Sequence, residues 1–163
     1  MHRTGHYGAA LLAYAPLGFV AAVLFGFELA IVGGAVAVGL SMVPDWDMRI
    51  PGVKHRGVTH TVHFAIGVGI IVGLLGFILG IQVGLGAAII LAVFGFLIGG
   101  ISIGSHIVAD ALTPAGVDPF MSGEPISYDV ARASNPIANY ALLVAGGLVT
   151  IAAVAAAGNI GSG

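Results

Sequence analysis

The chain has 163 residues, of which 58% are hydrophobic and 7% are charged, and its mean hydropathy is +1.09. Soluble domains carry about 25% charged residues, so this composition excludes an ordinary water-soluble domain. The formal net charge is −2 and the five Lys and Arg residues form no basic run, so we expect no nucleic-acid partner.

Five apolar runs approach the roughly 20 residues that a helix needs to cross a bilayer. They predict spanning helices at 8–27, 29–43, 62–81, 83–109 and 137–157. The runs are continuous rather than alternating, which favours helices over strands. We therefore expect an all-α fold, a polytopic membrane helical bundle of about five transmembrane helices, with the lipid bilayer around it. Glycine spacings at 76–80, 95–99 and 100–104 fit close helix packing in lipid.

The joins near Glu28 and Gln82 are short, so the first two and the next two helices should form antiparallel hairpins. Two polar stretches remain, at 44–61 and 110–136. An odd number of spans places both stretches on the same membrane face as the N-terminus, together with all five Lys and Arg residues. The positive-inside rule makes this face cytoplasmic. We therefore expect a multi-pass protein of the inner or plasma membrane.

Two carboxylates, Asp45 and Asp47, follow the proline that ends the second apolar run. Carboxylates at this spacing can ligate one or two divalent cations. The alternative is a solvated helix end, and the pair alone does not decide between the two. Trp46, which lies between them, is typical of an anchor at the membrane interface.

The segment His-Arg-Gly-Val-Thr-His-Thr precedes the third run and contains His55, Arg56 and His60. We expect Thr59 to cap the third helix, with His60 in its first turn and His63 one turn later on the same face. Neutral imidazole is the commonest metal ligand, and Arg56 is suited to binding a phosphate or carboxylate oxygen. The alternative is a basic loop that faces anionic lipid headgroups.

His106 and Asp110 end the fourth run with a spacing of four residues, so both side chains lie on one helix face. An ionisable pair at such depth indicates a functional site, in which both bind one ion or the carboxylate holds the histidine. The alternative is a structural hydrogen bond between helices. His2 and His6 have the same spacing at the N-terminus, where His6 is the better placed to join a site and His2 is expected to fray.

Four motifs in this order, H-x-G, P-D-x-D, H-R-G-x-T-H-T and H-x-x-x-D-x-x-T-x-x-G-V, resemble the LexA-regulated, membrane-bound, metal-dependent hydrolases. The resemblance covers nearly the whole chain and implies a single membrane-embedded hydrolase-like domain over residues 1–163. That family is distantly similar to the zinc-dependent phospholipase C and P1 nuclease group, which is all-helical and cleaves phosphoesters. The metal ligands that it implies are His6, Asp45, Asp47, His55, His60, His106 and Asp110. His2 and His63 lie outside the pattern, and further ligands would have to come from Asp118, Glu124 or Asp129.

The predicted function is a metal-dependent hydrolase that cleaves a phosphoester, such as a phospholipid headgroup, at the cytoplasmic face. The expected cofactor is a divalent metal, Zn²⁺ by the resemblance, bound as one or more ions. Such an ion lowers the pKa of bound water toward about 7 and polarises a phosphoryl oxygen. Arg56 would hold the charge of the substrate, and Asp45 or Asp47 would accept the proton of the attacking water.

A non-enzymatic membrane protein is the alternative, either a metal transporter or a metal-stabilised scaffold. A transporter is expected to carry ionisable residues near the midplane and polar or broken helices toward both sides. The first, third and fifth runs carry almost none, and the far face offers only Glu28 and Gln82. These features favour the hydrolase.

Overall fold

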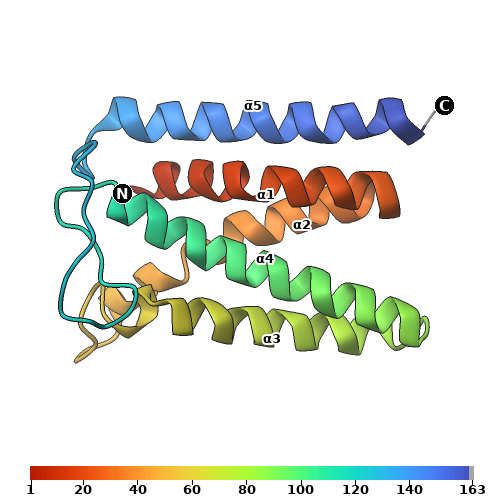
Figure 1. The fold of residues 1–163 in the computed structure, drawn as a ribbon, viewed down its shortest axis with the longest axis horizontal. Coiled ribbons are helices and arrows are strands. Elements are labelled where there is room, and N and C mark those ends of the chain that lie inside the picture. The colour runs from red at the N-terminus through yellow and green to blue at the C-terminus, as the bar shows by residue number, and fades with distance from the viewer. Residues whose placement is uncertain (162–163) are drawn as a thin grey trace.

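The computed structural model describes residues 1–161, and five long helices make up most of it (Figure 1). They are α1 (Arg3–Phe25), α2 (Phe27–Leu40), α3 (Val62–Gly80), α4 (Leu85–Ala111) and α5 (Pro136–Gly161). Each is long and apolar enough to cross a membrane, α2 when it is extended as far as Arg49. Within residues 1–161 the only β pairing is a single bridge between Val117 and Ile126. The predicted all-α bundle of five spanning helices is confirmed.

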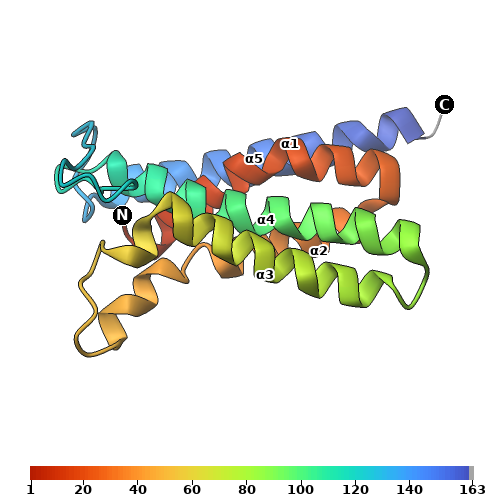
Figure 2. The ribbon, with the colours of Figure 1, turned by 60° about the horizontal axis from the view of Figure 1, so that its bottom comes forward.

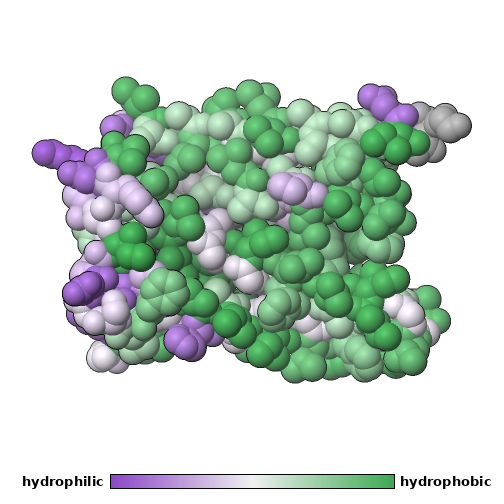
Figure 3. Space-filling model, in the orientation of Figure 1, coloured by the Kyte–Doolittle hydropathy of each residue, from purple (hydrophilic) through white to green (hydrophobic). Residues whose placement is uncertain are grey.

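The helices are arranged as two hairpins followed by α5, which runs parallel to α1 (Figure 1). The α1–α2 turn is at Gly26, whose φ of 95° lies in the region that favours glycine. The N-terminus and the segments 41–61 and 112–135 all lie at one end of the molecule, which we call the polar end (Figure 2). Figure 3 shows most of the hydrophilic surface at this end and a hydrophobic surface over the helices.

Close contact between α1 and α5 depends on one glycine in each helix. Gly8 faces the backbone of Leu142, and Gly146 faces the backbone of Gly8, so closely that a Cβ atom at either glycine would overlap its neighbour. The two helices therefore pack backbone to backbone, as small residues allow in lipid. The hydroxyl of Thr150 on α5 also donates a hydrogen bond of 2.9 Å to the Leu11 carbonyl on α1.

The α3–α4 hairpin is packed in the same way, with glycines from both helices against the opposite backbone. Of the glycines in the three predicted spacings, four face the backbone of the opposite helix: Gly76, Gly80, Gly95 and Gly99. A Cβ atom at Gly100 or Gly104 would meet no atom within 4 Å, so this third spacing takes no part in helix packing. On its other side α4 contacts α1 and α2, and it therefore lies between the two halves of the bundle.

Two short 3₁₀ helices at the polar end replace parts of the predicted elements. The first, η1 (Pro44–Arg49), follows α2, and the second, η2 (Val58–His60), precedes α3. Thr61, rather than Thr59, caps α3 by accepting a hydrogen bond of 3.1 Å from the backbone of Phe64. The expected cap was wrong because Thr59 donates instead to Asp47, at 2.8 Å. His60 consequently lies in η2 and is buried, whereas His63 is exposed on α3.

Candidate metal centre

The centre is built around His106 and Asp110, which lie one turn apart near the end of α4. Both side chains are buried, and His106 Nε2 is 3.7 Å from Asp110 Oδ2. The Nδ1 atom of His106 lies 2.6 Å from the Ser41 carbonyl oxygen. A carbonyl oxygen only accepts, so Nδ1 carries the hydrogen and the neutral ring presents its Nε2 lone pair to the centre.

His60 is oriented in the same way from η2. Its Nδ1 is 3.0 Å from the hydroxyl oxygen of Thr59, whose own hydrogen is donated to Asp47. The Thr59 oxygen is therefore the acceptor, and His60 Nδ1 carries the hydrogen. His60 Nε2, with its lone pair, then lies 3.2 Å from His106 Nε2. Two imidazole nitrogens without hydrogens thus face each other inside the protein.

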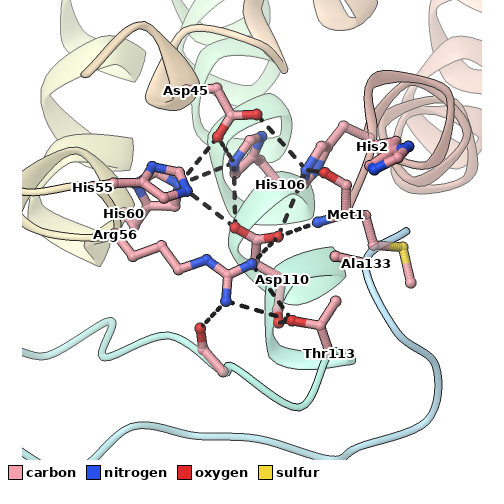
Figure 4. Close-up of polar contacts among 12 residues, drawn as sticks. Met1, His2, Asp45, His55, Arg56, His60, His106, Asp110, Thr113 and Ala133 are labelled. Atoms are coloured by element: carbon pink, nitrogen blue, oxygen red, sulfur yellow. Dashed lines mark hydrogen bonds and ion pairs between the residues drawn. The ribbon is translucent and has the colours of Figure 1, made fainter. Parts of the chain in front are cut away.

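Asp45 and Asp110 place carboxylate oxygens around the same point (Figure 4). Asp45 Oδ1 is 3.3 Å from His106 Nε2 and 3.5 Å from His60 Nε2, and Asp110 Oδ2 is 3.5 Å from His60 Nε2. Ligands bound tetrahedrally to zinc at about 2.0–2.1 Å are separated by about 3.3–3.4 Å. Five of the six separations among these four atoms are 3.2–3.7 Å, close to this value.

His6 lies against this group but outside it. Its ring is stacked on His106 with 3.7 Å between centroids, and its Nε2 is 3.6 Å from Asp110 Oδ1 and 4.0 Å from Asp45 Oδ2. Because Nε2 lies 3.0 Å from the Met1 carbonyl oxygen, it carries the hydrogen, and the buried Nδ1 has no hydrogen-bond partner among the described residues. His6 thus faces the outer oxygens of the two carboxylates, and its role as a ligand stays a prediction.

Asp47 and His55 form a second group with His60. Asp47 Oδ1 is 2.9 Å from His55 Nδ1, and Asp47 Oδ2 is 3.5 Å from His60 Nδ1. Asp47 is buried, whereas the His55 side chain is 42% exposed. The three donors lie close enough to hold an ion of their own, but the same contacts also place Asp47 behind His60 as the group that orients it. Metal binding by Asp47 and His55 stays a prediction.

Arg56 is bound to Asp110 from the solvent side. It has a φ of 60°, and its guanidinium donates to Asp110 Oδ1 at 3.0 Å and to the Gly116 carbonyl at 2.7 Å. Longer contacts of 3.4 and 3.5 Å reach the hydroxyl oxygen of Thr113. Thr113 and Gly116 belong to the H-x-x-x-D-x-x-T-x-x-G-V motif, but they were not among the predicted site residues. The motif's fixed spacing from Asp110 was the signal that could have identified them.

The first residues of the chain close the other side of the centre. The Met1 amino group contacts Asp110 Oδ1, and the backbone N–H of His2 donates to the side-chain oxygen of Asn139 at 3.0 Å. Asn139 is itself buried and donates to two backbone carbonyls of the segment before α5. Nothing in the sequence pattern identified Met1 or Asn139 as neighbours of the site.

The remaining candidates lie away from the cluster. The side chains of His2, His63, Glu124 and Asp129 are exposed, and none belongs to either ligand group among residues 1–161. Asp118 accepts hydrogen bonds from the backbone of Ser122 and Gly123. Desolvation raises the pKa of Asp118, but these bonds outweigh it and hold the pKa below its usual value. Asp118 therefore organises its own loop rather than the metal centre.

Together, the fold and the cluster define a class: a multi-pass α-helical membrane protein with buried His and Asp groups that can hold a metal ion at one end. The family model described as YdjM inner membrane protein matches residues 1–161, and the chain belongs to this family. The expected location in the inner membrane agrees with that membership. Searches of curated proteins and of solved structures returned no match.

Proposed function

We propose that the chain is a metal-dependent hydrolase whose centre lies at the cytoplasmic face of the inner membrane. The observation that supports a metal most strongly is the approach of His60 Nε2 to His106 Nε2, 3.2 Å apart with both lone pairs facing inward. Such a contact is unfavourable unless positive charge lies between the atoms. A proton would bridge only two atoms, whereas here two carboxylate oxygens converge on the same point. A set of two nitrogen and two oxygen donors suits Zn²⁺.

The outer oxygens of Asp45 and Asp110 leave room for a second ion. They face His6, at 4.0 and 3.6 Å from its Nε2, on the side opposite His60. His6 could bind this second ion through Nε2 only if the hydrogen moved to Nδ1, which would give up the hydrogen bond from Nε2 to the Met1 carbonyl. A second ion there would account for the buried position of His6 and agrees with the expectation of one or more ions.

When bound, a zinc ion supplies a water molecule of lowered pKa and polarises a phosphoryl oxygen. Among the four donors, Asp45 has the most exposed side chain, at 12%, against 0–2% for the others. With Asp45 off the ion, three protein donors would remain and a water could take the fourth position, and Asp45 would be the carboxylate best placed to accept the proton of that water. Asp47 is buried against His55, Thr59 and His60, and its contacts favour orientation of His60 over proton transfer.

Arg56 retains one donor for a substrate. Its two terminal nitrogens are used by Asp110, Thr113 and Gly116, which leaves the Nε–H to bind a phosphoryl oxygen. The five Lys and Arg residues all lie at the polar end, and this distribution supports a cytoplasmic orientation. A centre at the level of the headgroups makes a phospholipid, or another membrane-borne phosphoester, the natural substrate.

A metal-stabilised scaffold is the second candidate. His6, His60 and His106 are all 0% exposed, and full burial is typical of structural ions, which keep no open coordination position. The exposure of Asp45 favours catalysis instead. The two functions are separated by turnover, because both require the ion and only the hydrolase consumes a substrate.

The test compares the metal content and phosphoester hydrolysis of the purified wild type with those of two variants. Asp45→Asn keeps the size of a ligand side chain but removes its charge, and His63→Ala removes an exposed histidine outside the cluster. We expect metal and activity in the wild type and in His63→Ala, and a loss of both in Asp45→Asn. Bound metal without turnover on phosphoester and phospholipid substrates would assign the centre to the scaffold. A metal-free wild type purified with added zinc would exclude both functions.

A further inference from the structure

A cavity of about 950 Å³ opens beside the metal centre, between the start of α1, η1 and the start of α5. Asp45 lines this cavity and is also one of the four candidate metal donors, so the cavity adjoins the metal centre at this residue. Trp46, Tyr7 and Tyr140 also line it. Aromatic rings of this kind are typical of the headgroup region of a membrane.

Two arginines make the cavity positive. Arg3 and Arg49 both line it and are exposed, and neither side chain makes an ion pair or a hydrogen bond with any described residue. Among residues 1–161, Asp45 is the only acidic residue in the lining, and its oxygens face the metal centre. Two unpaired guanidinium groups in one cavity suit a phosphate group, to which each can donate two parallel hydrogen bonds.

A second, apolar cavity of about 710 Å³ lies deeper along the same helices. On α1 the polar cavity is lined by Arg3 and Tyr7 and the apolar one by Leu11, which is the next residue on that face at a spacing of four. On α2 the lining passes in the same way from Gly39 to Ala35, again at a spacing of four. Both α2 and α5 pack on α1, and the two cavities follow the valley that opens between them.

We propose that this valley binds one membrane phospholipid, with its phosphate between Arg3 and Arg49 and an acyl chain along the apolar cavity. The proposal rests on the proposed function and names the substrate class of that site, and it assigns the phosphate to Arg3 and Arg49 in place of Arg56, which does not line this cavity. Arg3 and Leu11 are separated by about 12 Å along α1, within the roughly 15 Å of one hydrocarbon leaflet. A ligand here must be anionic at one end and apolar at the other. The bilayer supplies such a molecule beside the valley.

Gly39 provides a way to block the valley without disturbing the fold. It lines the polar cavity, and a Cβ atom at this position would meet nothing within 4 Å. Gly39→Leu should therefore fill the lipid path and leave helix packing intact. Gly67→Leu is the matched control, because Gly67 on α3 also has open space around it and lies outside both cavities.

The single tryptophan of the chain, Trp46, lines the polar cavity and reports binding by its fluorescence. The wild type in detergent is titrated with dioleoylphosphatidylglycerol, with dioleoylglycerol, which lacks the phosphate, and with inorganic phosphate, which lacks the chains. We expect saturable binding of the phospholipid alone. The double variant Arg3→Gln/Arg49→Gln and Gly39→Leu should each raise its Kd about tenfold or more, and Gly67→Leu should leave it unchanged. Equal metal content and thermal midpoint show that each variant is folded.

Unchanged phospholipid binding in the arginine variant, or binding of inorganic phosphate as tight as that of the lipid, would overturn the proposal. So would a lipid-free dimer that Gly39→Leu dissociates, because a second copy of the chain would then fill the valley. Failure of the lipid-binding proposal can be distinguished from failure of the proposed hydrolase function. Arginine-dependent lipid binding without hydrolysis leaves this inference standing and removes the hydrolase, whereas hydrolysis with an unchanged KM in the arginine variant does the reverse.

Discussion

Asp47 lies behind His60 and is placed to orient its ring. Its carboxylate accepts the hydrogen of Thr59 and lies 3.5 Å from His60 Nδ1, and these contacts fix which nitrogen His60 presents. Loss of such an orienting partner typically costs about 10–100-fold in metal affinity. Loss of a true ligand instead removes the ion or lowers the number of ions bound.

We therefore expect Asp47→Asn to bind zinc about 10–100-fold more weakly than the wild type at unchanged stoichiometry. The measurement is a competition titration against a zinc chelator, with Asp129→Asn, an exposed carboxylate, as the control. A reduced number of ions per chain at saturating zinc would show that Asp47 is a ligand, as the sequence resemblance implies.

Arg56 is predicted to stabilise the polar end through its bond to Asp110. The two side chains are 18% and 2% exposed, and removal of one partner from a largely buried ion pair costs about 3–5 kcal/mol. Arg56→Gln should therefore lower the free energy of unfolding by a few kcal/mol, discounted for the partial exposure of Arg56. The thermal midpoint of the purified protein measures this, with the exposed Arg132→Gln as the control. Equal midpoints for the two variants would contradict the assigned pairing.

At the residue scale, the sequence placed His6, Asp45, His60, His106 and Asp110 at one end, and the structure brings all five together. It could not show the Arg56–Gly116 bond, because that contact joins residues 60 positions apart through a backbone carbonyl. The same holds for the hydrogen on His106 Nδ1, whose position depends on the carbonyl of Ser41 from another segment. Such features arise only when the helices pack.

At the scale of the helices, the α1–α5 contact should be more sensitive to side-chain size than its apolar composition suggests. Gly146 faces the backbone of Gly8, whereas its neighbour Gly147 has no atom within 4 Å of a Cβ position. Gly146→Val should separate the helices at a cost of about 1–3 kcal/mol or more, and Gly147→Val should not. Because the chain has no cysteine, a pair introduced at Leu11 and Thr150 reports the contact by its disulfide yield. Equal yields in both variants would exclude this packing.

The sequence predicted the five helices from the length of the apolar runs, since lipid leaves few other structures available. The boundaries were less accurate. Helix α1 begins at Arg3 rather than at residue 8, so His6 lies inside the helix. Two threonines of similar capping tendency lie next to α3, and only the tertiary contact of Thr59 with Asp47 decides that Thr61 is the cap.

At the scale of the whole molecule, the cytoplasmic orientation gives a direct labelling prediction. In intact spheroplasts, a membrane-impermeant maleimide should label Glu28→Cys, at the turn opposite the polar end. It should reach Lys54→Cys only after the membrane is permeabilised. The cysteine-free wild type is the background control. Labelling of Lys54→Cys from outside would invert the topology and move the centre to the periplasm.

The four metal donors come from η1, η2 and α4, so they are separated by up to 65 positions in the chain, from Asp45 to Asp110. During synthesis, Asp45 and His60 enter the membrane region well before α4 is complete. An ion that needs all four donors cannot be captured until Asp110 has left the ribosome and α4 has inserted. Capture of the proposed ion would therefore have to follow the insertion of α4, whereas α5 supplies none of these donors.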